Sequence, residues 1–489
     1  MEYSIAEYIN LSWLYWIIVT IYSLTILSTI IIILSENRNP VKSLAWVTVL
    51  ILLPAVGLIL YIFFGRSIKN THMISRRNRR RLKRRNTTNL NSNINNLNLT
   101  SISLSPESIH QIKLTRNLNG SKFYSRNDIK IYSDGYSKFE DFKHDLTQAK
   151  EYINIQYYII EDDNIGTEIK NILIAKASEG VKIRIIYDHV GSFSTKNSFF
   201  NEMKAAGIMV HPFFKVSFPF LGTRINWRNH RKLCIIDGEI GYIGGMNIAD
   251  RYLTGGNFDS WRDTHLRVTG SILTALQYSF TIDWNFMGQS LLEEETSSIK
   301  INDNTLSNIG MQFLTSGPTD QWSNIALVFL NAISNAKRSI IIQTPYFLPT
   351  ESLLKALQSA ALSNVNVRIM IPRHSDSKIL RFASYSYITE CLKAGIKFYF
   401  YEAGMLHSKS IIIDNEFSTV GSTNFDFRSF EHNFECNLFI YSKEVNAQMR
   451  EIFAEDLKHS TRINSKTWQK RPIFQKVTES ITRLLSPIL

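Results

Sequence analysis

Two stretches of this sequence share one pattern: "HRKLCIIDGEIGYIGGMN" (residues 230–247) and "HSKSIIIDNEFSTVGSTN" (residues 407–424). Each begins with His-x-Lys and runs through an apolar segment to an Asp. Each then returns through a second apolar segment, with Gly 14 residues and Asn 17 residues after the His. Two short apolar runs around a polar turn predict a β-hairpin. A lone His-x-Lys is common on protein surfaces and carries little information. A pattern this long that occurs twice indicates a function.

The hairpin predicts which side chains meet. A two-residue turn gives the pairs Asp237–Ile240, Lys232–Gly245 and His230–Asn247 in the first copy. The same count gives Lys409–Ser422 and His407–Asn424 in the second copy. Because residues i and i+2 share a face of a strand, His, Lys, the small residue and Asn are expected to converge on one spot.

This combination of side chains suits a phosphodiester. A lysine supplies charge for the non-bridging oxygens, an asparagine supplies an amide donor, and a small residue lets the phosphate approach the strand. A histidine attacks phosphorus or protonates the leaving oxygen, so two copies supply both a nucleophile and a general acid. Asp237 and Asp414 fall at the far end of each hairpin, off the His/Lys face, and are interpreted as structural anchors. No nucleotide-binding loop or metal motif accompanies the pattern, so catalysis without a metal or other cofactor is expected.

Each motif closes a repeated block. "AKEYINIQYYII" (149–160) matches "AKRSIIIQTPYFL" (336–348), and "EGVKIRIIYD" (179–188) matches "SNVNVRIMIP" (363–372). Apolar strands alternate with helical stretches in the same order in both blocks. The sequence therefore predicts two similar α/β sandwich halves, connected through residues 293–304.

The first block contains an additional segment. The spacing from Gly207 to His230 exceeds that from Gly395 to His407 by about 11 residues. The insertion lies within "HPFFKVSFPFLGTRINWRN" (211–229), in which phenylalanines and Trp227 alternate with basic residues. Either this segment caps the core, or it is a loop that enters lipid headgroups beside the site.

The N-terminal region predicts a membrane anchor. Residues 11–34 and 44–64 are uncharged and apolar, and each is long enough to cross a bilayer as a helix. The connector, 35–43, is so short that the two helices are expected to form a hairpin. Residues 66–85 hold ten basic side chains and no acidic one, which is expected to keep the following part of the chain cytoplasmic.

The net charge of +13 comes mostly from that basic cluster. A topology signal, attraction to anionic lipid and nucleic-acid binding are alternative interpretations. Nucleic acid is disfavoured because the charge adjoins a spanning helix and lies outside both repeats. The Asn-rich segment 86–105 is expected to be a linker. The three cysteines fit no metal or disulfide pattern and are expected to be buried thiols in a reducing compartment.

The motifs resemble those of the phospholipase D superfamily, whose members carry two His-Lys-Asp motifs. "NPVKSLAWVTVLILLPAVGLILYIFFGR" (39–66), "RINWRNHRKLCIIDGEIGYIGGMNIADRY" (224–252) and "GMLHSKSIIIDNEFSTVGSTNFDFRSF" (404–430) narrow the resemblance to bacterial cardiolipin synthases. The resemblance implies phosphatidyl transfer between two phosphatidylglycerol molecules, giving cardiolipin and glycerol through a phosphatidyl-histidine. It implies the catalytic set His230, Lys232, Asp237, His407, Lys409 and Asp414, with Asn247 and Asn424 as phosphate ligands.

The expected fold is two phospholipase D-like α/β halves packed as a pseudo-dimer behind a transmembrane hairpin. The expected boundaries are 1–66 for the anchor, 67–112 for the basic segment and linker, 113–300 for the first half and 301–489 for the second. The expected location is the inner membrane of a bacterial cell.

Two other enzyme classes stay open, a phospholipase D hydrolase that makes phosphatidic acid and a nuclease of the same superfamily. A membrane scaffold with a degenerate site is disfavoured by two intact motifs. The sequence leaves open which histidine is the nucleophile, the oligomeric state, and whether the acceptor is phosphatidylglycerol, another phospholipid or water. It also leaves open whether the basic and apolar tail, residues 468–489, docks on the membrane or on the second half.

Overall fold

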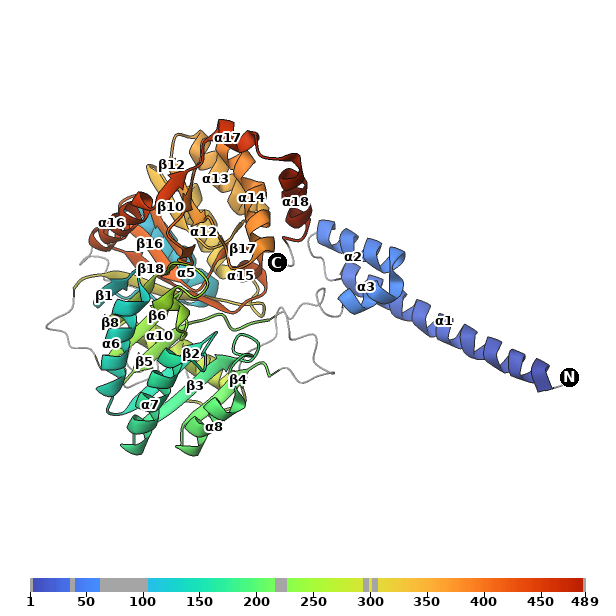
Figure 1. Ribbon diagram of the computed structural model, residues 1–489, viewed down its shortest axis with the longest axis horizontal. Coiled ribbons are helices and arrows are strands. Elements are labelled where there is room, and N and C mark those ends of the chain that lie inside the picture. The colour runs from blue at the N-terminus through green and yellow to red at the C-terminus, as the bar shows by residue number, and fades with distance from the viewer. Residues whose placement is uncertain are drawn as a thin grey trace. The chain divides into compact units, whose positions relative to one another are not determined.

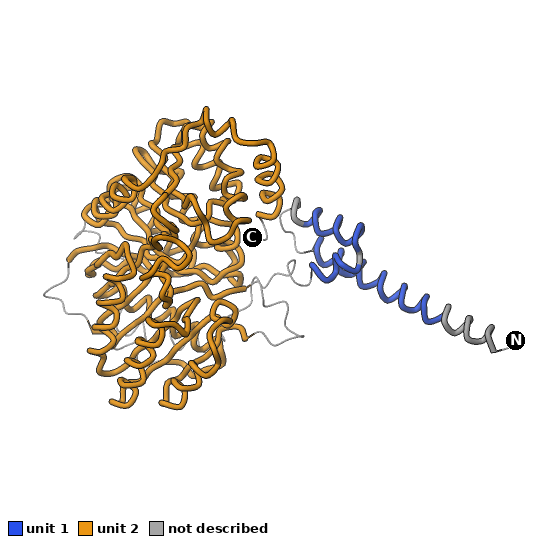
Figure 2. Tube along the Cα trace, in the orientation of Figure 1, with its two compact units in different colours: residues 1–67, 216–226 blue, residues 68–215, 227–489 orange. Residues whose placement is uncertain are grey.

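The computed structural model of the chain describes residues 3–35, 40–61, 104–215, 227–292, 299–300 and 307–486. It contains two compact units, residues 1–67 with 216–226 and residues 68–215 with 227–489 (Figure 2). Three regions singled out in the sequence lie outside the described residues: the basic cluster, nearly all of the Asn-rich segment, and residues 216–226 with Phe218 and Phe220.

The first unit is helical. Helix α1 spans Tyr3–Ser35, and its residues Trp13–Leu34 are long and apolar enough to cross a membrane. The second apolar run is divided into α2 (Pro40–Leu52) and α3 (Pro54–Leu60). The division follows from Pro54, which lacks an N–H group and whose ring clashes with the preceding turn of a helix. The predicted hairpin of two continuous spanning helices is therefore confirmed only for its first helix.

Helix α3 folds back onto α2 at a glycine. A Cβ atom on Gly57 would lie 2.7 Å from the carbonyl oxygen of Val49. Ile33, Leu50 and Tyr61 form the small buried core of this unit. The second apolar run is thus a compact helical pair in the part of the chain that the structure describes.

The second unit contains two large sheets (Figure 1). The first sheet consists of β1 (Asn127–Tyr132), β2 (Tyr152–Tyr157), β3 (Lys182–Asp188), β4 (Met209–Phe213), β5 (Leu233–Ile236), β6 (Ile240–Gly244) and β8 (His265–Gly270), in the order β1-β8-β6-β5-β2-β3-β4. Its helices are α6 (Gly135–Thr147), α7 (Asn164–Ser178), α8 (Asn197–Ala205), α9 (Arg251–Thr254) and α10 (Leu273–Phe286).

The second sheet consists of β9 (Gly310–Ser316), β10 (Ser339–Gln343), β12 (Asn366–Pro372), β13 (Lys397–Tyr401), β15 (Ser410–Ile413), β16 (Phe417–Gly421), β18 (Glu435–Tyr441) and β19 (Ser460–Arg462). Its order is β19-β13-β12-β10-β15-β16-β18-β9. Its helices are α12 (Asn324–Ser334), α13 (Glu351–Leu362), α14 (Lys378–Lys393), α15 (Phe427–Glu431), α16 (Lys443–Lys458), α17 (Ser465–Gln469) and α18 (Ile473–Leu484). Helix α5 (Pro106–Asn119) packs on α12 and β9 of this half.

The two sheets are copies of one arrangement, which confirms the predicted repeat. Read from opposite ends, the strand orders agree strand for strand, and β19 is an addition at one edge of the second sheet. In both sheets the strand before the first crossover helix, β2 or β10, pairs with a parallel strand on one side and with the motif hairpin on the other.

Helices cover both faces of each sheet. Along β5, Leu233 and Ile235 join the core that contains residues of α10 and α16, while Cys234 and Ile236 join the core of α6, α7 and α8. This alternation is the period-two pattern of a strand buried on both sides. Because the core of α10 and α16 includes residues of both halves, the halves are held together by a shared apolar interior.

Two short parallel pairs connect distant segments. Strands β7 (Trp261–Arg262) and β14 (Met405–Leu406) pair across the halves, and β11 (Phe347–Leu348) pairs with β17 (Phe425–Asp426) within the second half. An isolated parallel bridge joins Asn229 to Phe434 at the matching place. Each motif therefore enters its hairpin directly after a backbone contact with the other half.

The hairpins are confirmed, but their predicted register is wrong by one residue. Ile236 pairs with Ile240, and Ile413 pairs with Phe417. The turns therefore hold three residues, 237–239 and 414–416. The physical reason is the backbone of the first turn residue, since Asp237 and Asp414 adopt positive φ values of 52° and 49°. Lys232 consequently lies across from Gly244, whose N–H donates to the Lys232 carbonyl at 3.4 Å.

Both turn aspartates bind backbone amides of the neighbouring strand. The Asp237 carboxylate accepts from the N–H groups of Lys150 (2.6 Å), Glu151 (2.8 Å) and Tyr152 (2.8 Å). The Asp414 carboxylate accepts from the corresponding residues Lys337 (2.9 Å), Arg338 (2.7 Å) and Ser339 (2.9 Å). These contacts support an anchoring role at the start of β2 and β10. Membership of the catalytic set stays a prediction for both aspartates.

Asp237→Ala should lower stability while leaving the chemistry of the folded fraction in place. Three amides lose their acceptor and alanine is strained at positive φ, so we expect a loss of about 2–4 kcal/mol. Thermal unfolding in detergent measures this loss. The exposed turn residue Glu239 is the control, and Glu239→Ala should change stability by about 0.5 kcal/mol or less. A loss of turnover beyond about 10²-fold without destabilisation would instead indicate a proton carrier.

Candidate active site

The first motif histidine is held by the second half of the chain. The backbone N–H of His230 donates to the carbonyl of Phe434 at 2.9 Å. Its ring atom Nδ1 lies 2.9 Å from Oε1 and 3.1 Å from Oε2 of Glu435, the first residue of β18. Glu435 is fully buried, so its carboxylate is directed at the ring and away from water.

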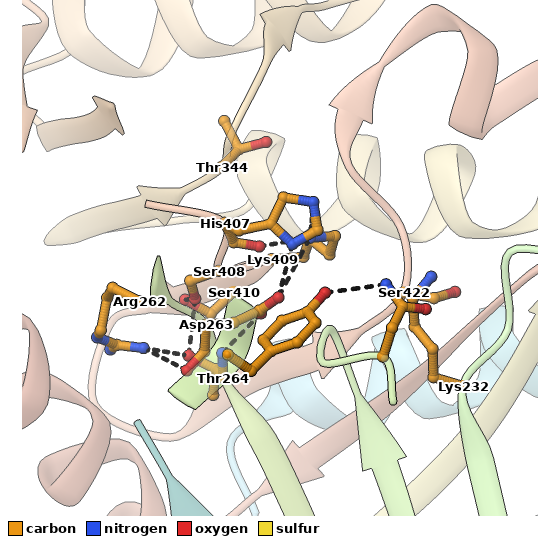
Figure 3. A network of polar contacts seen from close by, with 12 residues as sticks. Lys232, Arg262, Asp263, Thr264, Thr344, His407, Ser408, Lys409, Ser410 and Ser422 are labelled. Atoms are coloured by element: carbon orange, nitrogen blue, oxygen red, sulfur yellow. Dashed lines mark hydrogen bonds and ion pairs between the residues drawn. The ribbon is translucent and has the colours of Figure 1, made fainter. Parts of the chain in front are cut away.

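The second motif histidine is held by the first half in the same way. The N–H of His407 donates to the carbonyl of Arg262 at 2.7 Å. Its Nδ1 lies 2.6 Å from Oδ2 of Asp263. Figure 3 shows His407, Lys409 and Asp263 converging, with Lys232 and Ser422 on the other side of the same network.

The two carboxylates occupy equivalent positions of the repeat. Gly245 donates its N–H to the carbonyl of Thr264, and Ser422 donates its N–H to the carbonyl of Cys436, both at 2.9 Å. Thr264 directly follows Asp263, and Cys436 directly follows Glu435. Each half therefore gives its histidine to the site and its carboxylate to the histidine of the other half.

The small residue of each motif accommodates its carboxylate. A Cβ atom on Gly245 would lie 2.1 Å from Oδ1 of Asp263, so any side chain there would displace the acid. Ser422 instead donates its hydroxyl to the Glu435 carboxylate. The prediction that this residue makes room for a phosphate is therefore corrected, because the space beside Gly245 is filled by Asp263.

Each motif lysine contacts the histidine of its own motif. Lys232 Nζ donates to the His230 carbonyl at 2.6 Å, and Lys409 Nζ donates to the His407 carbonyl. Lys409 Nζ also lies 2.8 Å from His407 Nδ1 and 3.7 Å from Asp263. Both lysines are almost completely buried. Burial lowers the pKa of Lys409 and lowers the pKa of Lys232 to about 7, while nearby carboxylates oppose both shifts.

Buried arginine–carboxylate pairs fix the segments behind the site. Arg231 Nη1 donates to Asp283 at 2.7 Å, and its Nε donates to the carbonyl of Glu435 at 3.2 Å. Arg262 binds Asp456 through two parallel bonds of 3.0 and 2.9 Å, a geometry that restrains the guanidinium plane. Arg231 and Arg262 thereby restrain the backbone on which His230 and Asp263 stand.

Both histidine rings are neutral at pH 7. Burial lowers the pKa of His230 well below its ordinary value, and Lys232 and Lys409 add to the shift. Burial and Lys409 also lower the pKa of His407, against the opposing effect of Asp263. A neutral ring whose Nδ1–H faces a carboxylate has a free lone pair on Nε2, which is the form a nucleophile requires.

The two carboxylates differ in protonation. Burial raises the pKa of Glu435 to about 7, although Lys232 opposes this shift. Burial also opposes ionisation of Asp263, but Lys409 and His407 outweigh it and hold the pKa of Asp263 below its usual range. Asp263 is therefore ionised at neutral pH, whereas Glu435 is partly protonated.

The motif asparagines lie at the site but differ in their contacts. Asn247 Oδ1 accepts from the N–H of Ile159 at 3.1 Å, and its Nδ2 donates to the Tyr252 hydroxyl at 2.9 Å. Asn424 is 7% exposed, and its Oδ1 has no hydrogen-bond partner among the described residues. Asn247 is thus mostly committed to the fold, and the phosphate-binding role of both amides stays a prediction.

Sequence reasoning missed several residues of the site. The segments "WRDTH" (261–265) and "HNFEC" (432–436) offer His265 and Glu435 as candidate supports of the site, with a buried structural role as the alternative, but the sequence gives no reason to choose Asp263. His265 is fully buried beside the ring of Tyr157, and it has no hydrogen bond to any described residue. The missed signal was the equivalence of the strands β8 and β18, which aligns Asp263 with Glu435.

Two further side chains approach His230. Tyr158 contacts the His230 ring edge-on, with ring centroids 4.8 Å apart, and its ring lies 5.2 Å from Lys232 Nζ. The positive charge of Arg428, in α15, is close enough to contribute to the lowered pKa of His230. Together with both lysines, Arg428 makes the surroundings of the histidines electropositive, as an anionic phosphodiester requires.

The described flanks of the aromatic insertion belong to the core. Phe213 is fully buried and packs on Phe434, with ring centroids 5.3 Å apart. Phe214 packs on Trp227 at 6.5 Å. These contacts favour core capping for the two ends of the segment. The lipid-facing interpretation concerned Phe218 and Phe220, which lie outside the described residues.

The titration of Glu435 should appear in the pH profile of the enzyme. Only the ionised carboxylate stabilises positive charge on His230, and the bound phosphodiester keeps Lys232 charged, so kcat should rise with pH from about 7 upward. Glu435→Gln should remove this limb and lower kcat by about 10²- to 10⁴-fold. Because folded Glu435 holds its proton to higher pH than the unfolded chain, its ionisation lowers stability between pH 4.5 and about 7.

Asp263→Asn is the matched control for this pH profile. It should lower kcat similarly but keep the limb near pH 7, because the pKa of Asp263 is held below its usual range. Persistence of the limb in Glu435→Gln would contradict the assignment of the titrating group.

Comparison with known proteins places this site in a family. The family described as "Cardiolipin synthase, PLD-like domain" matches residues 142–268 and 329–457, one match in each half. The family described as "Phospholipase D-nuclease N-terminal" matches residues 23–66. The chain is 39% identical to the major cardiolipin synthase of Bacillus subtilis, over 96% of this chain and 98% of that protein. It is 40% identical to a cardiolipin synthase of Oceanobacillus iheyensis, with the same coverage.

A solved structure supports the fold. The phosphatidylserine synthase of Haemophilus influenzae Rd KW20 superposes with a TM-score of 0.60 at 14% identity. The match covers 78% of this chain and 100% of that one. The paired α/β halves are therefore a fold that experiment has observed.

Proposed function

This chain belongs to the cardiolipin synthase family of the phospholipase D superfamily, and we propose that it joins two phosphatidylglycerol molecules into cardiolipin with release of glycerol. The observation that carries the proposal is the pair of neutral histidines, each bound at Nδ1 by a carboxylate of the other half. This arrangement leaves both Nε2 atoms for one phosphorus and its leaving oxygen.

The first step forms a phosphatidyl-histidine. Nε2 of one histidine attacks phosphorus, the bond from phosphorus to the glycerol oxygen breaks, and the other histidine donates a proton to that oxygen. Lys232 and Lys409 stabilise the charge on the non-bridging oxygens. A bound phosphodiester also raises the pKa of the buried lysines and of the second histidine, which favours the charged forms that the step uses.

The second step reverses the roles around the same phosphorus. The headgroup hydroxyl of a second phosphatidylglycerol gives its proton to the histidine that served as acid, and its oxygen displaces Nε2 from phosphorus. The carboxylate behind the nucleophilic histidine stabilises the positive ring during both steps. Water at the same position would give phosphatidic acid, so the lipid acceptor distinguishes the proposed reaction from that of a phospholipase D hydrolase.

We further propose that the chain crosses the bacterial membrane twice, with the apolar run 44–64 as a single straightened helix in the bilayer, and keeps its catalytic part in the cytoplasm. The proposal rests on α1, on the length and hydropathy of the run 44–64, and on the ten basic residues at 66–85. It requires that α3, which folds back onto α2 in the structure, align with α2 in lipid. Residues 1–66, 67–112, 113–300 and 301–489 are proposed as the anchor, linker, first half and second half. A role on nucleic acid is not proposed, because the basic cluster adjoins an apolar run.

Purified enzyme in detergent with phosphatidylglycerol should produce cardiolipin and free glycerol in equal amounts. His230→Ala and His407→Ala should each lower turnover by more than about 10⁴-fold, because neither role is replaceable. The exposed His110 is the control, and His110→Ala should leave turnover unchanged. Phosphatidic acid without cardiolipin would contradict the transferase reaction, and high activity in either single variant would contradict the two-histidine mechanism.

An activated substrate should identify the nucleophile. The leaving group of phosphatidyl-p-nitrophenol departs without a proton, so the variant that lacks only the general acid should release one equivalent of p-nitrophenolate. The variant that lacks the nucleophile should release none. Release by both His230→Ala and His407→Ala, or by neither, would contradict a division of roles between the two residues.

A further inference from the structure

The last described helix exposes an apolar face. Helix α18 lies against α14 at one side of the second half (Figure 1). Its strongly exposed side chains are Ile473 (78%), Phe474 (81%), Val477 (50%), Ile481 (57%) and Leu484 (81%). At 3.6 residues per turn these positions form a single stripe along the helix.

The face of α18 that packs on the fold is polar. Glu479 is 1% exposed and accepts hydrogen bonds from Arg471 Nε at 3.0 Å and Gln475 Nε2 at 2.9 Å. Arg483 forms an ion pair of 2.6 Å with Glu390 of α14. The usual orientation of an amphipathic helix on a soluble domain is therefore reversed. Because these polar contacts fix the helix, the exposed stripe is a feature of the folded unit.

A stripe of this kind marks a contact with apolar surroundings, since burial of large apolar side chains is favourable. The charges on the segment indicate which surroundings. Residues 465–486 carry five basic side chains and one acidic side chain, a net charge of +4. Cations beside an apolar helical face are typical of helices that lie on anionic lipid. A symmetric contact with a second copy would instead bring two such charges together.

We propose that α18 is a membrane-contact helix, which lies in the plane of an anionic bilayer with its apolar stripe in the acyl-chain boundary. It holds the catalytic unit on the lipid surface in addition to the N-terminal anchor. The membrane contact itself is argued from α18 alone. Its purpose, to give lipid headgroups access to the site, rests on the proposed function.

A fluorescent label on α18 tests the contact in the full-length protein. An environment-sensitive dye is attached to the cysteine of the Phe474→Cys variant. The dye labels this site selectively, because the three native cysteines are buried. In vesicles of phosphatidylcholine and phosphatidylglycerol, brominated acyl chains should quench this dye at least about twofold more than the dye on Leu362→Cys. Leu362 is a matched control, since it is apolar, 70% exposed and at the end of α13. Equal quenching at both sites overturns the proposal. Shielding of residue 474 from aqueous iodide without lipid quenching also overturns it, in favour of a second copy or the chain's own N-terminal helices.

A pair of polar substitutions tests the consequence for turnover. Phe474→Ser with Leu484→Ser should lower turnover on bilayer phosphatidylglycerol by about tenfold, and leave turnover of a dissolved short-chain phosphatidylglycerol unchanged. Tyr136→Ser with Leu362→Ser removes as many exposed apolar side chains elsewhere and should change neither rate. Unchanged bilayer turnover in the α18 variant, or an equal loss in the control, contradicts the proposal. If no substrate yields cardiolipin, the proposed function fails while the quenching result still decides the membrane contact.

Discussion

Each histidine of the site is held by a carboxylate that the other half of the chain supplies. Glu435 of the second half lies 2.9 Å from His230 of the first half, and Asp263 of the first half lies 2.6 Å from His407 of the second half. Neither half alone contains an oriented histidine. The shared apolar core, the parallel β7–β14 pair and the Asn229–Phe434 bridge all serve to bring these partners together. The duplication of the fold is thus a requirement of the chemistry, since each copy completes the site of the other.

Burial determines which of the exchanged groups are charged. Two lysines, two carboxylates and two imidazoles lie together with almost no exposure, so the balance among them decides which groups are charged. The result is two neutral rings, an ionised Asp263 and a partly protonated Glu435. A bound phosphodiester supplies a negative counter-charge for the two lysines. The asymmetry of the two acids, in a site that is otherwise two-fold, is a physical basis for different roles of the two histidines.

The local pattern predicted much of this structure, because strand periodicity and repetition are encoded along the chain. The paired halves and hairpins were predicted, whereas the register was not, since it depends on the left-handed backbone of Asp237 and Asp414. Asp263 was missed because its partner lies 144 residues away in the sequence. Hydropathy alone favoured a continuous second helix where Pro54 divides the run. The charge and hydropathy of the C-terminal tail left two docking surfaces open, the membrane and the second half, because the orientation of α18 depends on the Arg471–Glu479 and Arg483–Glu390 pairs.

The carboxylate exchange is tested most directly by ¹⁵N NMR of histidine-labelled enzyme in lipid nanodiscs, with the tautomer of each catalytic ring read from its two nitrogen shifts. Both rings should carry the proton on Nδ1 above pH 7. Glu435→Gln should change the shifts of His230 and leave those of His407, whereas Asp263→Asn should do the reverse. Shifts of His230 and His407 that do not respond to the carboxylate of the opposite half would contradict the account.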